Sequence, residues 1–207
     1  MIGPEFAAIW VAWIMAGGSP GPATMGIAGT AMTSGRGSAL AFALGILAGS
    51  ASWGIAAALG LSAIMLANLF VFEIIRYIGA AYLGWLALKA LRSAWTGGAA
   101  VAGTPFTGSH RALFAKGAGI HLTNPKAILS WGSIYALILP PDATPAALFL
   151  CFALLYAGSI MIFLGYAVLF SNTRIVGAYG RARRWFDLAF AGFFGLASYK
   201  ILTARLQ

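Results

Sequence analysis

Long apolar stretches with few polar interruptions make up most of the chain. No charged residue lies between Glu5 and Arg36, between Arg36 and Glu73, or between Asp142 and Arg174. A membrane-spanning helix needs about 20 apolar residues, and each of these stretches is long enough. Runs bounded by charges or turn residues predict six spanning helices, at about 6–30, 39–66, 70–91, 112–139, 145–170 and 186–204.

Composition narrows the class of protein further. Of the 207 residues, 61% are hydrophobic and 8% are charged, whereas charged residues make up about a quarter of a soluble domain. An all-α integral membrane protein in contact with the lipid bilayer is therefore predicted. The net charge of +9 would suit a nucleic-acid partner. However, the basic residues lie at the ends of apolar runs, where they set membrane orientation, so no nucleic-acid partner is expected.

The basic residues favour one orientation in the membrane. Most of them lie in or beside the connections after helices one, three and five, and few lie on the opposite side. Because positive charge stays on the cytoplasmic side, both termini are predicted to lie outside. The larger group is Arg36, Lys89, Arg92, Arg111, Lys116, Arg174, Arg181, Arg183 and Arg184, and the smaller group is Arg76, Lys200 and Arg205. Within the larger group, the last three arginines are expected to anchor the chain by touching lipid phosphates.

The single cysteine and the N-terminus limit the other possibilities. Cys151 has no second cysteine to pair with, so no intrachain disulfide forms and two-cysteine redox chemistry is excluded. The start of the chain, MIGPEFAAIW, carries Glu5 and no basic region. The first apolar run is therefore expected to remain as a helix rather than to be cleaved as a signal peptide.

The chain divides into two similar halves. The stretch from Ser93 to His110 is rich in Gly, Thr and Pro, which indicates a linker at about 96–110 between repeat one (about 1–95) and repeat two (about 111–207) of a single domain, 1–207. LGWLALKAL (83–91) and FGLASYKIL (194–202) align at three positions, a match short enough to arise by chance. Because each half has three spans, the second must be inverted relative to the first, as in many secondary transporters.

Two helices are predicted to be interrupted, the first at Ser19-Pro20 and the fourth at Asn124-Pro125. Proline removes one backbone donor and frees the carbonyl four residues earlier. The carbonyls freed by Pro20, Pro22 and Pro125 are those of residues 16, 18 and 121, and each must find a partner in protein or in a water-filled cavity. Ser-Pro and Asn-Pro also suit the N-cap and first turn of a helix, so each interrupted helix is expected to restart near the membrane midplane.

Restarted helices carry the partial positive charge of their N-terminal ends, which suits a carboxylate. Lys126 adds a full charge next to the second break, although a lysine there costs about 2.5–3.5 kcal/mol at the bilayer centre. A site-lining role is favoured, and snorkelling or pairing with a carbonyl is the structural alternative. The predicted substrate-binding residues are Ser19, Pro20, Gly21, Pro22, Thr24, Asn124, Pro125 and Lys126.

His121 lies one turn before the second break and fits two roles equally. It can relay protons, or it can be a hydrogen-bonded structural histidine.

Other features are interpreted as packing. Gly45 and Gly49 form a GxxxG pattern that lets helices approach closely. The aromatic residues Trp10, Trp13, Trp85, Trp95 and Trp131 are interpreted as interface anchors or core, with no chemistry.

Three stretches resemble the LysE/RhtB family of bacterial amino-acid exporters. They are SPGPAT in the first helix, YIGAAYLGWLALK in the third and FAKGAGIHLTNPKAIL in the fourth. The family's proline-glycine-proline motif matches residues 20–22, its asparagine-proline-lysine motif matches residues 124–126, and its glycine-rich third helix matches Gly79, Tyr82, Leu83 and Gly84. The resemblance implies a six-helix permease of the bacterial cytoplasmic membrane. It also implies a homodimer that exports amino acids or close relatives with an ion gradient, and protons are the expected coupling ion.

The sequence departs from the family pattern at three places. Ser19 and Ala23 flank the first motif, where an asparagine is usual, and the fourth helix ends in LPPD (139–142) without the usual glutamine and phenylalanine. Ser50 stands where an acidic residue is common. With all four acidic residues predicted near span ends, a cationic substrate would lack a buried partner. A neutral or zwitterionic substrate is therefore expected.

Two other classes of function remain open. A membrane-embedded enzyme would need a nucleophile, a base and an orienting group, and two histidines without a deep acid or a metal-ligand cluster do not supply them. No enzyme activity, cofactor or metal is therefore expected. A non-catalytic membrane subunit would leave the paired breaks and the midplane charge without a purpose.

Overall fold

The computed structural model describes residues 4–67, 69–96, 105–138 and 143–203. Within these ranges the chain is helical, with no strand. Its helices are α1 (Pro4–Gly18), α2 (Pro22–Ala67), α3 (Leu69–Thr96), α4 (His110–Leu122), α5 (Pro125–Ile138), α6 (Pro145–Leu169) and α7 (Thr173–Thr203). The all-α prediction is thus confirmed for the described residues. The predicted LPPD, Asp142, Arg205 and the middle of the linker lie outside them.

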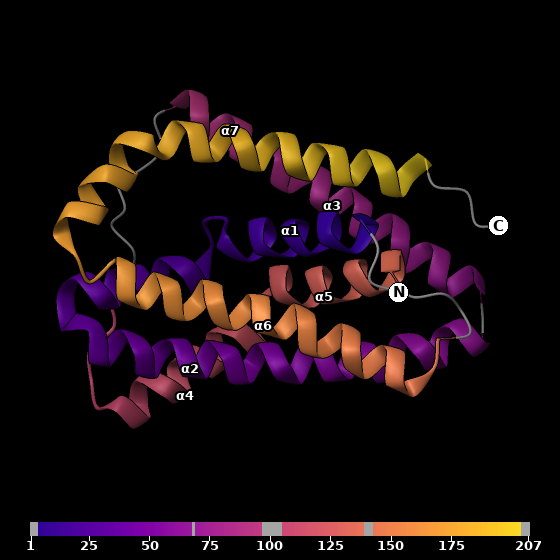
Figure 1. Cartoon of the computed structure of the whole chain (residues 1–207), viewed down its shortest axis with the longest axis horizontal. Coiled ribbons are helices and arrows are strands. Elements are labelled where there is room, and N and C mark those ends of the chain that lie inside the picture. Colours follow the sequence, from indigo (N-terminus) through magenta and orange to yellow (C-terminus); the bar gives the residue numbers. More distant parts are fainter. Residues whose placement is uncertain (1–3, 68, 97–104, 139–142, 204–207) are drawn as a thin grey trace.

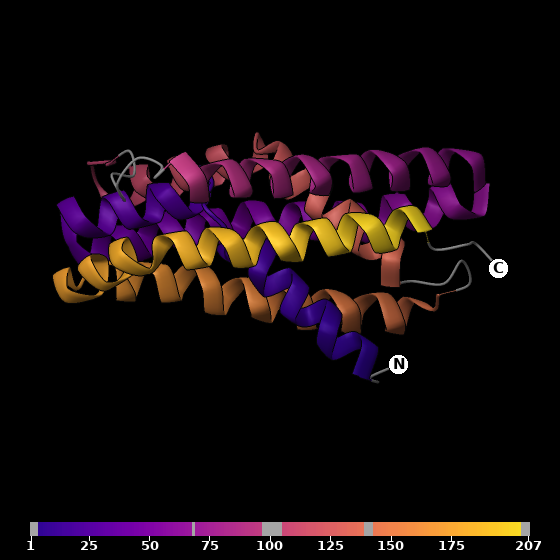
Figure 2. The ribbon, with the colours of Figure 1, turned by 90° about the horizontal axis from the view of Figure 1, so that it is seen from above.

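The helices run side by side along the long axis of the molecule (Figure 1). One end of the bundle holds a sharp bend within α2, the end of α3 and the starts of α4 and α7 (Figures 1 and 2). The two chain termini lie toward the other end. The elements that carry most of the basic residues therefore share one end of the bundle.

Both predicted interruptions are present. α1 ends at Gly18 and α2 begins at Pro22, while α4 ends at Leu122 and α5 begins at Pro125. Within the predicted span 6–30 the chain forms α1 and the first part of α2, and the predicted span 112–139 is divided between α4 and α5.

Where a connection between the first two spans was predicted, α2 bends sharply. α2 continues as helix from the first span into the second, and it turns at Gly35, whose φ of 81° and ψ of 175° are not helical. Only glycine adopts this backbone conformation readily.

The predicted start of the sixth helix at residue 186 was wrong. α7 begins at Thr173, because Asn172 caps it: the Asn172 side-chain oxygen accepts the Arg174 N–H at 2.9 Å. The first part of α7 is arginine-rich and was interpreted as a loop from its polarity. Asp187, predicted near a span end, therefore lies in the middle of a helix and is 2% exposed.

Close backbone contact joins α2 to α4. A Cβ added at Gly45 would collide with the Phe114 carbonyl, and one added at Gly117 would collide with the Phe42 carbonyl. The predicted role of the small residues around Gly45 in close packing is confirmed.

Candidate substrate site

The first helix break is closed by hydrogen bonds from its own side chains. The Ser19 hydroxyl donates to the Ala16 carbonyl at 2.9 Å. The Gly21 N–H donates to the Thr24 hydroxyl oxygen at 3.1 Å. Because α2 begins at Pro22, the N-cap is Gly21 and not Ser19. The predicted capping role of Ser19-Pro20 was wrong: Pro22 occupies the first helical position, and Thr24 reaches back to the cap as in half of a capping box.

The second break follows the predicted pattern. The Asn124 side-chain oxygen accepts the Lys126 N–H at 3.0 Å, and the Asn124 N–H donates to the His121 carbonyl at 3.1 Å. Asn124 is thus the N-cap of α5, with Pro125 at its first position.

Aromatic side chains from other helices bind the last carbonyl of each half-helix. The Tyr166 hydroxyl of α6 donates to the Gly18 carbonyl at 2.5 Å, and the Trp53 indole of α2 donates to the Leu122 carbonyl at 3.1 Å. The carbonyls left by the breaks are therefore satisfied by protein, as backbone in a membrane requires.

Lys126 connects the two breaks. Its ammonium group donates to the Ser19 carbonyl at 2.9 Å and to the Ser19 hydroxyl oxygen at 2.6 Å. A Cβ added at Gly21 would lie in ordinary van der Waals contact with Lys126 Nζ, at 3.5 Å, so the lysine ammonium lies beside the start of α2. The contact with a carbonyl agrees with the structural alternative for this lysine. However, the lysine also faces a cavity, as the site-lining role requires.

A cavity of about 40 Å³ lies where α1, α2, α4, α5 and α6 meet. Of the predicted site residues, Gly21, Thr24, His121, Asn124 and Lys126 line it. Ser19 is not in its wall but is hydrogen-bonded to two residues that are, Lys126 and Thr24. The three prolines Pro20, Pro22 and Pro125 are also not in the wall. The rest of the wall is Trp13, Ala16, Gly17, Ala23, Ser50, Ala127, Ser130, Trp131, Ser159 and Phe163.

Two indole groups, of Trp13 and Trp131, are buried in the core as predicted, and they also line the cavity. Trp131 Nε1 donates to the Ser50 hydroxyl at 3.2 Å, and Trp13 Nε1 donates to the Ser159 hydroxyl at 3.0 Å. The two rings also contact each other, with centroids 4.4 Å apart. Sequence reasoning missed Trp13, Trp131, Ser130 and Ser159, and it identified Ser50 only as a departure from the family pattern. Ordinary membrane-helix composition hid them, since small and aromatic residues are common throughout such helices.

Two buried polar atoms in the wall have no hydrogen-bond partner among the described residues. They are Nδ1 of His121 and the hydroxyl oxygen of Ser130. His121 is 5% exposed, and its ring meets the edge of Phe163 at 5.6 Å between centroids. The prediction of a hydrogen-bonded structural histidine is therefore not met at Nδ1.

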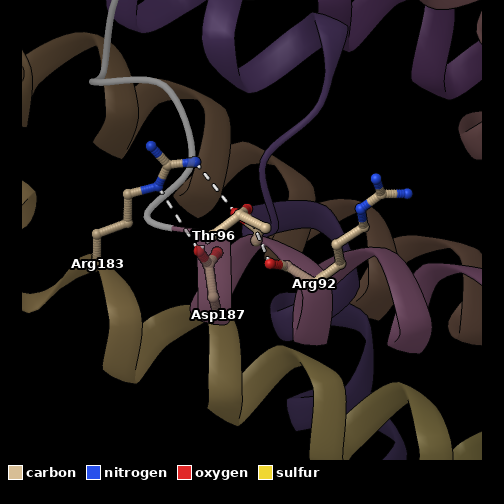
Figure 3. A network of polar contacts seen from close by, with 5 residues as sticks. Arg92, Thr96, Arg183 and Asp187 are labelled. Atoms are coloured by element: carbon tan, nitrogen blue, oxygen red, sulfur yellow. Dashed lines mark hydrogen bonds and ion pairs between the residues drawn. The ribbon is translucent and has the colours of Figure 1, made fainter.

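The charge of the cavity wall is positive. Of the residues that line the cavity, Lys126 carries a formal charge, and none has a carboxylate side chain. Asp187 does not contribute, because it lies between α7 and α3 (Figure 3). There it is 3.6 Å from Arg183 and accepts a 2.8 Å hydrogen bond from Ser93. No group of three His, Cys, Asp or Glu side chains that could hold a metal ion occurs in the part of the chain that the structure describes.

By length and hydropathy, two helical stretches of the described chain are suited to cross a membrane. They are Pro22–Gly60 and Pro145–Leu169, and Ile9–Gly18 is a shorter apolar helix. Among the described residues, fewer stretches than the six predicted therefore meet this criterion.

Comparison with known proteins identifies the family. The family model described as LysE type translocator matches residues 14–205. The chain belongs to the LysE family of translocators. It is a bacterial inner-membrane, multi-pass protein, and the resemblance seen in the sequence motifs is confirmed.

Relatives of this LysE-family chain include named efflux proteins. The threonine efflux protein of Salmonella typhimurium is 33% identical over 190 residues, which covers 89% of this chain and 91% of the relative. The threonine efflux protein of Escherichia coli K12 is 32% identical over 203 residues, covering 96% and 98%. The homoserine/homoserine lactone efflux protein of Salmonella typhimurium is 26% identical over 188 residues, covering 90% of each chain. No solved structure matches this LysE-family chain.

Proposed function

We propose that this LysE-family translocator exports a neutral or zwitterionic amino acid, or a close derivative, across the cytoplasmic membrane in exchange for protons. Relatives named for threonine efflux share about a third of their residues with this chain over nearly its full length, which supports an amino-acid substrate. The absence of a carboxylate from the cavity wall argues against a cationic side chain on the substrate.

Lys126 carries the proposal. Its ammonium group lies at the cavity and is held by the oxygens of Ser19, which a substrate carboxylate replaces in the proposed complex. The starts of α2 and α5 line the same cavity, and the positive ends of helices favour an anion. A carboxylate bound there is neutralised by one formal charge and two helix ends.

Substrate binding and conformational change are linked through the same contact. Lys126 belongs to the second half of the chain and Ser19 to the first, 107 residues away. When a carboxylate takes the lysine, this link between the halves breaks. The cavity of about 40 Å³ has room for a few water molecules but not for an amino acid, so binding requires the helices to separate.

The proposed architecture is six spans arranged as two inverted three-helix repeats. Reciprocal packing of α3 and α7 supports it: Gly84 faces Ser198, and Gly195 faces Ala87. In the match of 83–91 with 194–202, Gly84 aligns with Gly195, and Ala87 aligns with Ser198. Each glycine therefore faces the residue that lies three positions after the other glycine, as a twofold relation between the helices would produce. The basic residues predict that both termini lie outside the cell, and the family resemblance predicts a homodimer.

His121 is the proposed proton carrier for the exchange. It is a titratable side chain buried in the same wall as Lys126, and an imidazole can take up and release a proton. His121→Ala is expected to weaken the pH dependence of transport, and an unchanged dependence would contradict this role.

Counterflow in proteoliposomes tests the proposed function. Purified protein is reconstituted with a panel of labelled neutral, basic and acidic amino acids, with and without a pH gradient. Saturable uptake of a neutral amino acid, increased by the gradient, is the expected result. Covalent alteration of a panel member would favour an enzyme, and flux of none would favour a non-catalytic subunit.

A further inference from the structure

Some polar groups in the cavity wall have a hydrogen-bond partner among the described residues, and others have none. On one side Lys126 is already bonded to Ser19. On the other side His121 Nδ1 and Ser130 Oγ are buried without a partner among the described residues. Buried polar atoms in proteins almost always have a partner, so two exceptions in one cavity indicate a bound group.

The type of group follows from what the atoms can accept. A neutral imidazole nitrogen and a hydroxyl oxygen both accept hydrogen bonds, and an ammonium group offers three donors. Ser130 stands four residues after Lys126 on α5, so both side chains lie on one face of the helix. Lys126, Ser130 and His121 line the same cavity, so an amino acid whose carboxylate binds Lys126 can place its amino group at these acceptors.

No negatively charged side chain lines the cavity around His121, so a cation bound there must use the neutral acceptors His121 Nδ1 and Ser130 Oγ. Lys126 of α5 is the other titratable group that lines the cavity, and it is taken by the carboxylate. From the helices packed around it, α1 contributes Trp13, α2 contributes Thr24 and Ser50, and α6 contributes Ser159 and Phe163. None of these side chains titrates near neutral pH.

We infer that His121 Nδ1 and Ser130 Oγ form the binding subsite for the α-ammonium group of the substrate, and that the coupling proton competes with this ammonium for His121. This inference rests on the proposed function, because it takes the carboxylate at Lys126 as given. An imidazole that binds a proton becomes a cation and repels the ammonium. Proton and substrate thus occupy the subsite in turn, which is the condition for their exchange.

Equilibrium binding to the purified full-length protein tests the subsite, with threonine as the probe. Two analogues each lack one group: 3-hydroxybutanoate lacks the amino group, and 1-aminopropan-2-ol lacks the carboxylate. The wild-type protein is expected to bind threonine at least about 10-fold more tightly than 3-hydroxybutanoate. Ser130→Ala and His121→Ala are expected to reduce that ratio, and Lys126→Ala to reduce the advantage of threonine over 1-aminopropan-2-ol instead.

His121→Gln separates the two parts of the inference. Glutamine keeps an acceptor but does not titrate, so ammonium binding persists while proton competition is lost. In the wild-type protein the dissociation constant of threonine rises as pH falls from about 8 to about 4, by up to about 10-fold per unit once the proton occupies the site. In His121→Gln it is expected to stay constant over this range.

Matched controls exist in the chain. His110 is the second histidine and is exposed at the start of α4, so His110→Gln leaves both ratios and the pH dependence unchanged. Ser52 is exposed and bonded to its own helix, so Ser52→Ala serves for Ser130→Ala.

Equal binding of threonine and 3-hydroxybutanoate by the wild-type protein would overturn the inference, as would His121 and Ser130 variants with unchanged ratios. That result would indicate that water alone fills the subsite, and it leaves amino-acid export intact. If the His121 variants do not fold, the wild-type comparison and Ser130→Ala decide the question. Binding of no amino acid at all is a different outcome, and it overturns the proposed function itself.

Discussion

Lys126 Nζ lies 2.9 Å from the carbonyl oxygen of Ser19, and this contact joins two helix breaks that are 107 residues apart in the chain. The lysine follows the break between α4 and α5, and the serine lies in the break between α1 and α2. Each break supplies what the other lacks: one provides a cation, and the other provides backbone and hydroxyl oxygens freed from helical bonding.

Lys126→Ala is expected to abolish transport while the protein still inserts and folds. Removing one partner of a buried charge contact costs about 2–5 kcal/mol of binding, on the order of 100-fold or more in affinity. Losing the lysine removes its two hydrogen bonds to Ser19 but also an insertion cost of about 2.5–3.5 kcal/mol, so the net change in thermal stability should be small. Counterflow and thermal unfolding in detergent measure the two effects. Lys116→Ala, at an exposed lysine of α4, is the control, and normal flux in Lys126→Ala would refute the site assignment.

Ser19→Ala is expected to weaken substrate binding less than Lys126→Ala does. The lysine keeps its bond to the Ser19 carbonyl, but the hydroxyl that accepts from Lys126 and donates to Ala16 is lost. The free energy of unfolding should fall by about 1–3 kcal/mol, since two hydrogen bonds of about 0.5–1.5 kcal/mol each are lost. Thermal unfolding compared with Ser52→Ala provides the measurement. A loss of transport as complete as that of Lys126→Ala would show that the hydroxyl itself binds substrate.

Gly117→Leu is expected to disrupt the packing of α4 on α2. A side chain at this position collides with the backbone of Phe42, which cannot move aside as a flexible side chain would. Overpacking of this kind costs about 1–3 kcal/mol or more. Gly60→Ala is the matched control, because nothing lies within 4 Å of its added Cβ. Since alanine is favoured over glycine in helices by about 1 kcal/mol, the control should be neutral or more stable. Equal melting temperatures for the two variants would contradict the close approach of α2 and α4.

Asp187→Asn is expected to reduce stability without abolishing transport. The carboxylate contacts Arg183 and Ser93 where α7 packs on α3 (Figure 3). Asp187 is not among the residues that line the cavity. Asparagine keeps an acceptor for the Ser93 hydroxyl but loses the charge, at a cost of about 1–3 kcal/mol. Thermal unfolding and the pH dependence of counterflow test this expectation. If the pH dependence disappeared in Asp187→Asn while His121→Ala kept it, the aspartate would be the proton carrier.

The sequence by itself determined the membrane class, the two breaks and the lysine beside the second one. Each of these depends on local chemistry. Hydropathy fixes which segments avoid water, proline removes backbone donors wherever it stands, and an Asn-Pro pair starts a helix with contacts inside a single turn. The family motifs fall on the same residues, which is why the predicted site and the cavity share Gly21, Thr24, His121, Asn124 and Lys126.

Local signals also misled where two of them competed. The Ser19-Pro20 pair resembles a cap, yet α2 starts at Pro22, because Pro22 and Thr24 together form a better helix start. The arginines after Thr173 suggested a loop, yet Asn172 begins a helix there. Polar side chains indicate that a segment contacts water, but they do not indicate whether its backbone is helical.

Only the tertiary structure decided which distant side chains meet. Trp131 reaches Ser50 across 81 residues, and Trp13 reaches Ser159 across 146. Helical periodicity gives the direction of a side chain from its own axis, but not the neighbouring helix toward which that face is turned. That choice depends on how closely the helices approach, which small residues at their contacts allow and side-chain volumes limit.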